Sequence, residues 1–145
     1  MMSEIIRHEV DEDLAYSGFV EAGDFIFLSF CAGNVGKSVE EQVEGALDNM
    51  SDRLASVNLT LESVVKVDVL MRDVWDIPAM EAIFKRRFKG NYPARKTIAT
   101  EFAHKGGSSG LKVQIDAVAY KRCVIPCLMK LGDSITFDPA NEKKS

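Results

Sequence analysis

Residues Val64–Arg72 read Val-Val-Lys-Val-Asp-Val-Leu-Met-Arg, and every second residue from Val65 to Met71 is apolar. A period of two is typical of a strand that buries one face, because successive side chains of a strand point to opposite sides. We therefore predict a half-buried strand over residues 64–72. The segments before and after it have the period of helices, which places this strand between two helical segments of the chain.

Both predicted helices are amphipathic. The first begins at Ser38, which forms a capping box with Glu41, and continues to about residue 56. Gly45 interrupts this helix at a cost of about 1 kcal/mol relative to alanine. The second helix has Asp76 as its cap and ends at Gly90. Apolar residues at steps of three and four give each helix one buried face: Val39, Val43, Ala46, Leu47, Met50 and Leu54 in the first, and Met80, Ile83, Phe84 and Phe88 in the second.

Three further segments have the composition of strands. Residues 24–31 are apolar on both faces except at Ser29, as in a central strand. Residues 97–100 follow a proline corner, and apolar and polar residues alternate over residues 111–120. Two helices can cover one face of the resulting sheet, so we expect an α+β fold whose other face is apolar and is buried against another subunit.

The size of the chain limits its domain organisation. With 46% hydrophobic and 28% charged residues, 145 residues suffice for one compact domain and leave no room for a second. We place this single domain at residues 1–120. Residues 121–145 are predicted to be a C-terminal extension, docked at residues 124–129 and frayed at its end. No window is apolar enough for a membrane span and the N-terminus lacks a secretory signal, so we predict a cytoplasmic protein without a membrane partner.

Neither a metal site nor a cofactor is predicted. Cys123 and Cys127 are four residues apart, wider than the gap usual for a zinc knuckle or a redox pair. We interpret all three cysteines as reduced, buried thiols. The glycines of residues 105–110 precede a strand rather than a helix, so they do not match a phosphate-binding loop. His8 and His104 have no serine or cysteine partner at a recognisable spacing, and we interpret both as structural or solvated.

The charge distribution argues against a general nucleic-acid binder. The net charge is -4, whereas affinity for a phosphate backbone requires an excess of lysine and arginine. Six of the eighteen cations nevertheless lie in residues 85–96, which contain no acid. We interpret the four cations at residues 85–89 as solvated side chains that complement the end of the second helix.

Arg95 lies beyond that helix. It follows the corner Asn91-Tyr92-Pro93-Ala94 and leads into the strand at residues 97–100. A guanidinium has planar donors that bind both oxygens of a carboxylate, and such a charge-assisted pair contributes about 1.5 to 3 kcal/mol when it is partly desolvated. We therefore predict that Arg95 binds a small carboxylate ligand.

Four segments resemble the Rid, or YjgF-type, family of reactive-intermediate deaminases, and the resemblance extends from Tyr16 to Tyr120. The segments are Val43-Glu44-Gly45-Ala46-Leu47-Asp48-Asn49-Met50, Val64-Val65-Lys66-Val67-Asp68-Val69 with Arg72-Asp73, Tyr92-Pro93-Ala94-Arg95, and Val113-Gln114-Ile115-Asp116-Ala117-Val118-Ala119. The resemblance implies a chorismate-mutase-like α+β fold with a mixed sheet, a homotrimer, and ligand clefts between neighbouring subunits. It also implies hydrolysis of 2-imino acids to 2-keto acids and ammonia without a metal.

The resemblance assigns roles to individual residues. Arg95 occupies the position of the arginine that holds the substrate carboxylate, and Tyr16 and Ser29 occupy those of a tyrosine and a serine that line the cleft. Gln114 stands where deaminating members have an acid that positions water, and an amide cannot take a proton from water. Asp116 is expected on the same face as Gln114, about 7 Å further along the strand.

Three further positions differ from the family pattern. Thr97 and Phe30, at positions expected to contact the ligand, replace a frequent cysteine and a small glycine, and Glu81 replaces an asparagine of the second helix. Three interpretations of Glu81 remain open: a general base, a partner that pairs with Arg95 and blocks it, or a solvated helical acid. We predict a trimer that binds 2-imino or 2-keto acids and hydrolyses imines, with a non-catalytic ligand-sensing or partner-binding trimer as the alternative. The resemblance also implies a less favoured third reading, an RNA-binding or ribonuclease-type member with residues 85–96 as its basic contact.

Overall fold

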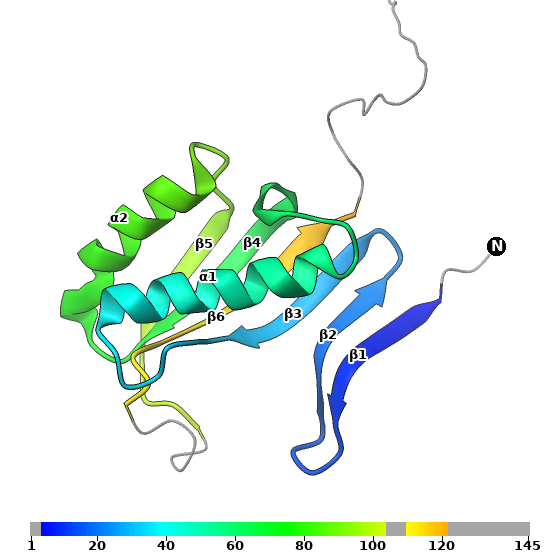
Figure 1. Ribbon diagram of the computed structural model, residues 1–145, viewed down its shortest axis with the longest axis horizontal. Helices are drawn as coiled ribbons and strands as arrows, with labels where there is room; N and C mark the ends of the chain where they lie inside the picture. Colours follow the sequence, from blue (N-terminus) through cyan, green and yellow to red (C-terminus); the bar gives the residue numbers. More distant parts are fainter. Residues whose placement is uncertain (1–3, 104–109, 122–145) are drawn as a thin grey trace, which may run out of the picture.

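The structure is a computed structural model that describes residues 4–103 and 110–121. Six strands form one sheet in the order β1-β2-β3-β6-β4-β5 (Figure 1). The elements are β1 (Ile5–Asp11), β2 (Tyr16–Ala22), β3 (Phe25–Cys31), α1 (Val39–Ala55), η1 (Leu61–Ser63), β4 (Val64–Met71), η2 (Val74–Asp76), α2 (Ile77–Phe88), β5 (Ala94–Ala99) and β6 (Val113–Tyr120).

The sheet is mixed. β4 and β5 are parallel and are joined through α2, whereas the other neighbouring strands are antiparallel. The last strand, β6, lies in the middle of the sheet, between β3 and β4. Both helices lie on the same face of the sheet (Figure 1). These observations confirm the predicted α+β fold with two helices on one face.

Two predictions that depend only on residues close in sequence are confirmed: the capping box of α1 and the alternation of β6. Ser38 caps α1: its hydroxyl accepts a hydrogen bond from the backbone N–H of Glu41 at 3.1 Å, and the Glu41 carboxylate accepts one from the N–H of Ser38 at 3.2 Å. Every second residue of β6 is buried beneath the helices, as the alternation predicted. These residues are Val113, Ile115, Ala117 and Ala119.

The predicted alternation at the start of β4 is wrong. Val64 is 4% exposed and Val65 is 45% exposed, although the period of two placed Val65 on the buried face. The pairing of β4 with β6 shifts between Val64 and Lys66. Such an irregularity turns the residues before it to the opposite face of the sheet, so the regular alternation begins only at Val67.

The predicted cap of the second helix is also different. Asp76 occupies the N-cap position of α2, but its side chain makes no capping hydrogen bond, because the turn η2 runs directly into the helix. The carboxylate of Asp73 caps η2 instead and accepts a hydrogen bond from Trp75 N at 2.9 Å. At the other end, Lys89 and Gly90 both have positive φ angles, and there the chain turns back towards β5.

The face of the sheet without helices is not uniformly apolar, which corrects the expectation from single strands. Its apolar residues on β3 and β6 are Phe25, Phe27, Val118 and Tyr120. Charged side chains interrupt them: Lys66 Nζ lies 2.6 Å from Asp68 Oδ1 on β4, and Asp116 on β6 lies opposite Asp68. A pattern read one strand at a time does not show that these charges meet across two strands.

The interpretation of the cysteines as buried thiols is confirmed for Cys31, and that of the histidines as structural is confirmed for His8. Cys31 is a free, buried thiol, and burial raises its pKa to about 11. His8 is structural: its Nε2 lies 2.6 Å from Glu21 Oε2, and its ring stacks on Phe19. Cys123, Cys127 and His104, and residues 122–145 of the predicted extension, lie outside the described residues. In the part of the chain that is described, no helix is long and apolar enough to cross a membrane.

Candidate functional site

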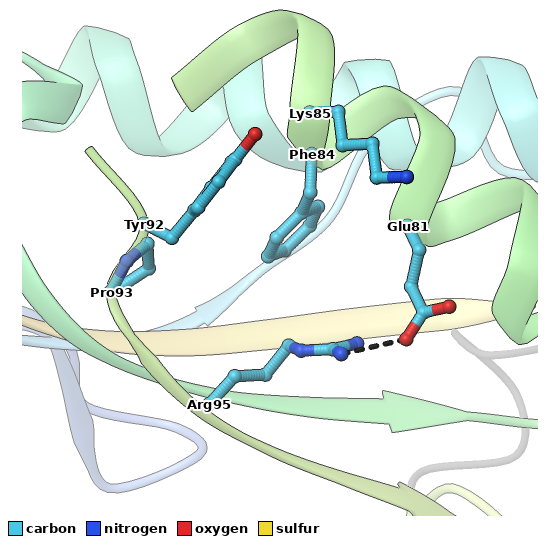
Figure 2. Close-up of a pocket in the computed structure, with 6 residues that line it drawn as sticks. All are labelled: Glu81, Phe84, Lys85, Tyr92, Pro93 and Arg95. Carbon is cyan, nitrogen blue, oxygen red and sulfur yellow. Dashed lines mark hydrogen bonds and ion pairs between the residues drawn. The ribbon is translucent and has the colours of Figure 1, made fainter. Parts of the chain in front are cut away.

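Arg95 is held on the edge strand of the sheet. β5 pairs with β4 in parallel, and Arg95 lies opposite Val67, whose side chain is fully buried beneath the helices. The Arg95 side chain extends on the same side, towards α2 (Figure 2). Thr97, two residues further on, shares this side and is partly buried. The turn at Lys89 and Gly90 therefore decides that Arg95 returns beneath the helix that precedes it in the sequence.

The guanidinium of Arg95 contacts two residues of α2. Its Nη2 donates a hydrogen bond to Oε2 of Glu81 at 2.7 Å (Figure 2). Its Nη1 lies 3.5 Å from Sδ of Met80. The side chains of Arg95 and Glu81 are 30% and 44% exposed. Glu81 is thus paired with Arg95 and partly solvated at the same time.

A pocket of about 430 Å³ lies beside this ion pair. It is lined by Glu81, Phe84, Lys85, Tyr92, Pro93 and Arg95 (Figure 2). Apolar walls with a few convergent charged groups are typical of sites for small molecules. Lys85 was not predicted to line this pocket, although its position one helical turn after Glu81 puts both on one side of α2.

Tyr16, Ser29 and Phe30 form a second group, on β2 and β3. The rings of Tyr16 and Phe30 are stacked with their centroids 5.8 Å apart. The Ser29 hydroxyl donates a hydrogen bond to the carbonyl oxygen of Gly18 at 2.8 Å. The pairing of β3 with β6 is irregular between Leu28 and Cys31, so Ser29 and Phe30 lie at a bulge.

Arg53 of α1 supports this bulge. Its Nη1 contacts the carbonyl oxygens of Phe30 at 3.0 Å and of Ser29 at 3.3 Å, and its Nε donates to Oε1 of Glu9 at 3.1 Å. The Arg53 side chain is only 10% exposed. The sequence shows only a basic residue in the last turn of a helix, which is an ordinary surface pattern, so Arg53 was missed.

Gln114 and Asp116 lie on β6, where both are partly exposed and alternate with buried neighbours. The prediction that they share a face is therefore confirmed. Burial, and secondarily the negative charge of Asp68 opposite, raises the pKa of Asp116. A hydrogen bond from Lys66 lowers the pKa of Asp68. The charges of Asp116, Asp68 and Lys66 thus influence one another, and Asp116 is two residues from Gln114 on the same strand.

The predicted site residues do not all meet within one chain. Arg95 lies on the helix side of the sheet, whereas Gln114 lies on the uncovered side. Tyr16 and Ser29 belong to β2 and β3, which β6 and β4 separate from Arg95 on β5. That these residues line one cleft stays a prediction, and it requires a neighbouring subunit to bring them together.

The basic stretch at residues 85–96 is partly neutralised by acids from α1. Arg86 and Arg87 both pair with Glu44, and Arg87 also pairs with Asp48 at 3.0 Å. With the Arg95–Glu81 pair, three of its six cations have acidic partners among the residues that the structure describes. Over the same residues, no group of three histidine, cysteine or acidic side chains could hold a metal ion.

Comparison with known proteins places most of the described chain in one family. The family model described as Endoribonuclease L-PSP matches residues 7–121, a range that contains every predicted site residue. The chain belongs to the YjgF (Rid) family. The resemblance drawn from the four sequence segments is thereby confirmed.

Solved structures of YjgF proteins share the fold. A Streptococcus pyogenes protein described as a member of the yjgF family is 56% identical, with a TM-score of 0.77 over 84% of this chain and 100% of that chain. A member from Neisseria meningitidis is 24% identical, with a TM-score of 0.75 over 85% of this chain and 99% of that chain. At the lower identity the comparison supports the fold alone.

Named relatives of this YjgF chain include imine deaminases. The rat 2-iminobutanoate/2-iminopropanoate deaminase is 32% identical over 134 residues, which cover 81% of this chain and 93% of the rat protein. The human protein of the same name is 34% identical over 85 residues, 59% of each chain. The mitochondrial protein mmf2 of Schizosaccharomyces pombe is 31% identical over 112 residues, 72% of this chain and 86% of that protein.

Proposed function

We propose that the chain binds small 2-imino or 2-keto acids through Arg95 and hydrolyses 2-imino acids to 2-keto acids and ammonia. The observation that carries this proposal is the pocket in which Arg95 and Lys85 provide positive charge beside the apolar side chains of Phe84 and Tyr92. A short aliphatic acid has the matching chemistry, a carboxylate and an apolar tail. Relatives named 2-iminobutanoate/2-iminopropanoate deaminase support this substrate class.

The ion pair with Glu81 does not prevent ligand binding to Arg95. Both side chains are partly exposed, and a pair of this kind contributes about 0 to 1 kcal/mol. Charge-assisted hydrogen bonds to a ligand carboxylate contribute about 1.5 to 3 kcal/mol. Arginine has five N–H donors, of which one contacts Glu81 and one the sulfur of Met80, so donors remain for the ligand.

The proposed site is a cleft between subunits of a homotrimer. The uncovered face of the sheet exposes Phe25 and Phe27, and exposed apolar surface of this kind favours association. Gln114 lies on that face and Arg95 on the other, so only a neighbouring chain could bring one towards the other. We also propose that the protein works in the cytoplasm.

Hydrolysis requires a group that accepts a proton from water. The oxygen of water bonds to the imine carbon while the base takes one water proton and passes it to the nitrogen. The second proton of that oxygen then moves to the nitrogen as the carbon–nitrogen bond breaks, ammonia leaves and the carbonyl forms. Gln114 can hold the water but cannot take its proton. Glu81 is the carboxylate that lines the Arg95 pocket, and we propose it for this role. Equal rates of ammonia release by the wild type and Glu81→Gln would remove it from the mechanism.

The experiment that tests ligand binding is titration calorimetry with 2-ketobutyrate, combined with ammonia release from enzymatically generated 2-iminobutanoate. Arg95→Ala should weaken binding by about 10-fold to 150-fold, the equivalent of 1.5 to 3 kcal/mol. Arg86→Ala is the matched control, since Arg86 pairs with Glu44 and does not line the pocket. If Arg95→Ala leaves both affinity and rate unchanged, Arg95 is not the carboxylate anchor.

The alternative is a trimer that binds the ligand without turning it over. The amide at Gln114 favours it, because the family's acid is absent at that position. Binding of 2-ketobutyrate without measurable ammonia release from the imine would support this alternative. An RNA contact at residues 85–96 is less favoured because acidic partners neutralise half of its cations, and salt-insensitive or absent RNA binding would dismiss it.

A further inference from the structure

We propose that Glu81 makes the Arg95 pocket selective for zwitterionic ligands, in which a protonated nitrogen is attached to the carbon that bears the carboxylate. This inference rests on the proposed function, because it takes Arg95 as the carboxylate anchor. It adds that 2-iminium acids, and 2-amino acids of the same skeleton, bind more tightly than 2-keto acids. Glu81 is the specificity-determining residue.

The geometry places one positive and one negative group side by side. Nη2 of Arg95 and Oε2 of Glu81 are 2.7 Å apart, and both residues line the same pocket (Figure 2). Oε1 of Glu81 and Nε of Arg95 make no hydrogen bond to any residue in the described ranges. Oε1 of Glu81 is therefore left as an acceptor for a ligand on one side of the ion pair, and Nε of Arg95 as a donor on the other side.

A zwitterion matches this pair because its two charges are also adjacent. When the ligand carboxylate lies on Arg95, the nitrogen on the neighbouring carbon lies next to Glu81. The four charges then alternate in sign, and each has two neighbours of opposite charge. The Arg95–Glu81 contact does not have to break, so the ligand gains a partner for both of its charged groups.

A 2-keto acid has the opposite relation to Glu81. It carries the carboxylate, which Arg95 can hold, but no positive charge, so its carbonyl oxygen lies beside the Glu81 carboxylate without a positive group between them. The same pocket therefore holds the iminium form of a substrate more tightly than the keto acid that hydrolysis produces. In the wild type, this difference favours product release over product inhibition.

Lys85 provides the matched control. It lines the same pocket, on the helical turn after Glu81, and it attracts any ligand carboxylate irrespective of the ligand nitrogen. Lys85→Gln should therefore weaken the binding of zwitterions and of keto acids to a similar extent. Glu81→Gln, which keeps the shape and removes the charge, should change the ratio of the two affinities.

The test measures affinity by titration calorimetry at pH 7 for L-2-aminobutyrate and 2-ketobutyrate, which share a carbon skeleton. We expect the wild type to bind the amino acid about tenfold more tightly than the keto acid. Glu81→Gln should weaken binding of the amino acid and strengthen binding of the keto acid, so that the ratio of the two affinities falls by about tenfold. Circular dichroism confirms that the variants are folded. A ratio that is the same in the wild type and Glu81→Gln, or a wild type that prefers the keto acid, overturns the inference.

The same experiment separates this inference from the proposed function. If Arg95→Ala abolishes binding of both ligands while Glu81→Gln leaves their ratio unchanged, the carboxylate anchor stands and the selectivity is wrong. If Arg95→Ala changes neither affinity, or neither ligand binds the wild type, the anchor itself is wrong and the selectivity falls with it.

Discussion

Gly45 of α1 and Gly33 of the segment after β3 pack backbone against backbone. A Cβ built at Gly45 would lie 2.8 Å from the carbonyl carbon of Gly33 and 2.8 Å from Nδ2 of Asn34. That amide nitrogen is held in place, since it donates a hydrogen bond to the carbonyl oxygen of Glu41 at 2.8 Å. The glycine that weakens the helix by propensity is therefore required by the close approach of a second chain segment.

Gly45→Ala should destabilise the protein even though alanine is the better helix former. The gain in helix propensity is about 1 kcal/mol, whereas overpacking against a backbone costs about 1 to 3 kcal/mol. We expect a net loss of up to about 2 kcal/mol in the free energy of unfolding, measured by urea denaturation. Asp52→Ala, at an exposed position of the same helix, is the control. A Gly45→Ala variant more stable than the wild type would contradict the packing argument.

Arg53→Ala should cost about 2 to 3 kcal/mol of stability, because it leaves the carbonyl oxygens of Ser29 and Phe30 without their charged donor. Arg86→Ala should cost less than about 1 kcal/mol, since the Arg86 side chain is 59% exposed. Urea denaturation of both variants makes the comparison. Similar losses for the two arginines would show that Arg53 does not hold the bulge.

Asp116 should make stability decrease as the pH rises. Burial and the charge of Asp68 raise the pKa of Asp116, so the folded state binds its proton more strongly than the unfolded state does. This contribution is fully present below the unfolded pKa of about 4 and is lost as the pH rises through the higher folded pKa. Asp116→Asn removes the ionisable group and with it this decrease in stability at higher pH. Its stability relative to the wild type should therefore increase from pH 3.5 to pH 7 in urea denaturation, whereas a constant difference would exclude the effect.

Phe27→Asp should dissociate the proposed trimer, because it places a charge in the apolar part of the uncovered sheet face, where Phe27 is 45% exposed. Analytical ultracentrifugation should give three times the 16.0 kDa chain mass for the wild type and a smaller species for the variant. Ala55→Asp, at an exposed position on the helix side, should leave the mass unchanged. A wild type that sediments as a monomer would refute the trimer directly.

In the Glu81→Gln variant, which lacks the proposed general base, adding Gln114→Glu should increase imine hydrolysis by about 100-fold or more, the usual contribution of a positioned general base. The increase should appear in kcat rather than in KM, because Arg95 remains the proposed carboxylate anchor. Ammonia release from 2-iminobutanoate measures it, and Gln114→Ala should show no gain. If the carboxylate at position 114 brings no increase, Gln114 does not stand at the reacting centre.

The sequence by itself determined the features that depend on residues a few positions apart. The capping box of Ser38 and Glu41, the buried stripe of α2 and the alternation of β6 all follow from local periods, and the structure has them. The family also follows from sequence, because four ordered segments match its pattern and the family model covers residues 7–121. Arg95 was singled out by its place after the proline corner, and Glu81 by comparison with the family pattern.

Only the tertiary structure decided which of these residues meet. Strand β6 lies between β3 and β4, and this order sets Asp116 opposite Asp68 and exposes Val65 at a shifted register. The turn after α2 brings Arg95 back to Glu81, fourteen residues earlier, and so joins the charges from which the ligand proposals start. Local periods do not encode such contacts, because they depend on how the strands pair and on which helix covers them.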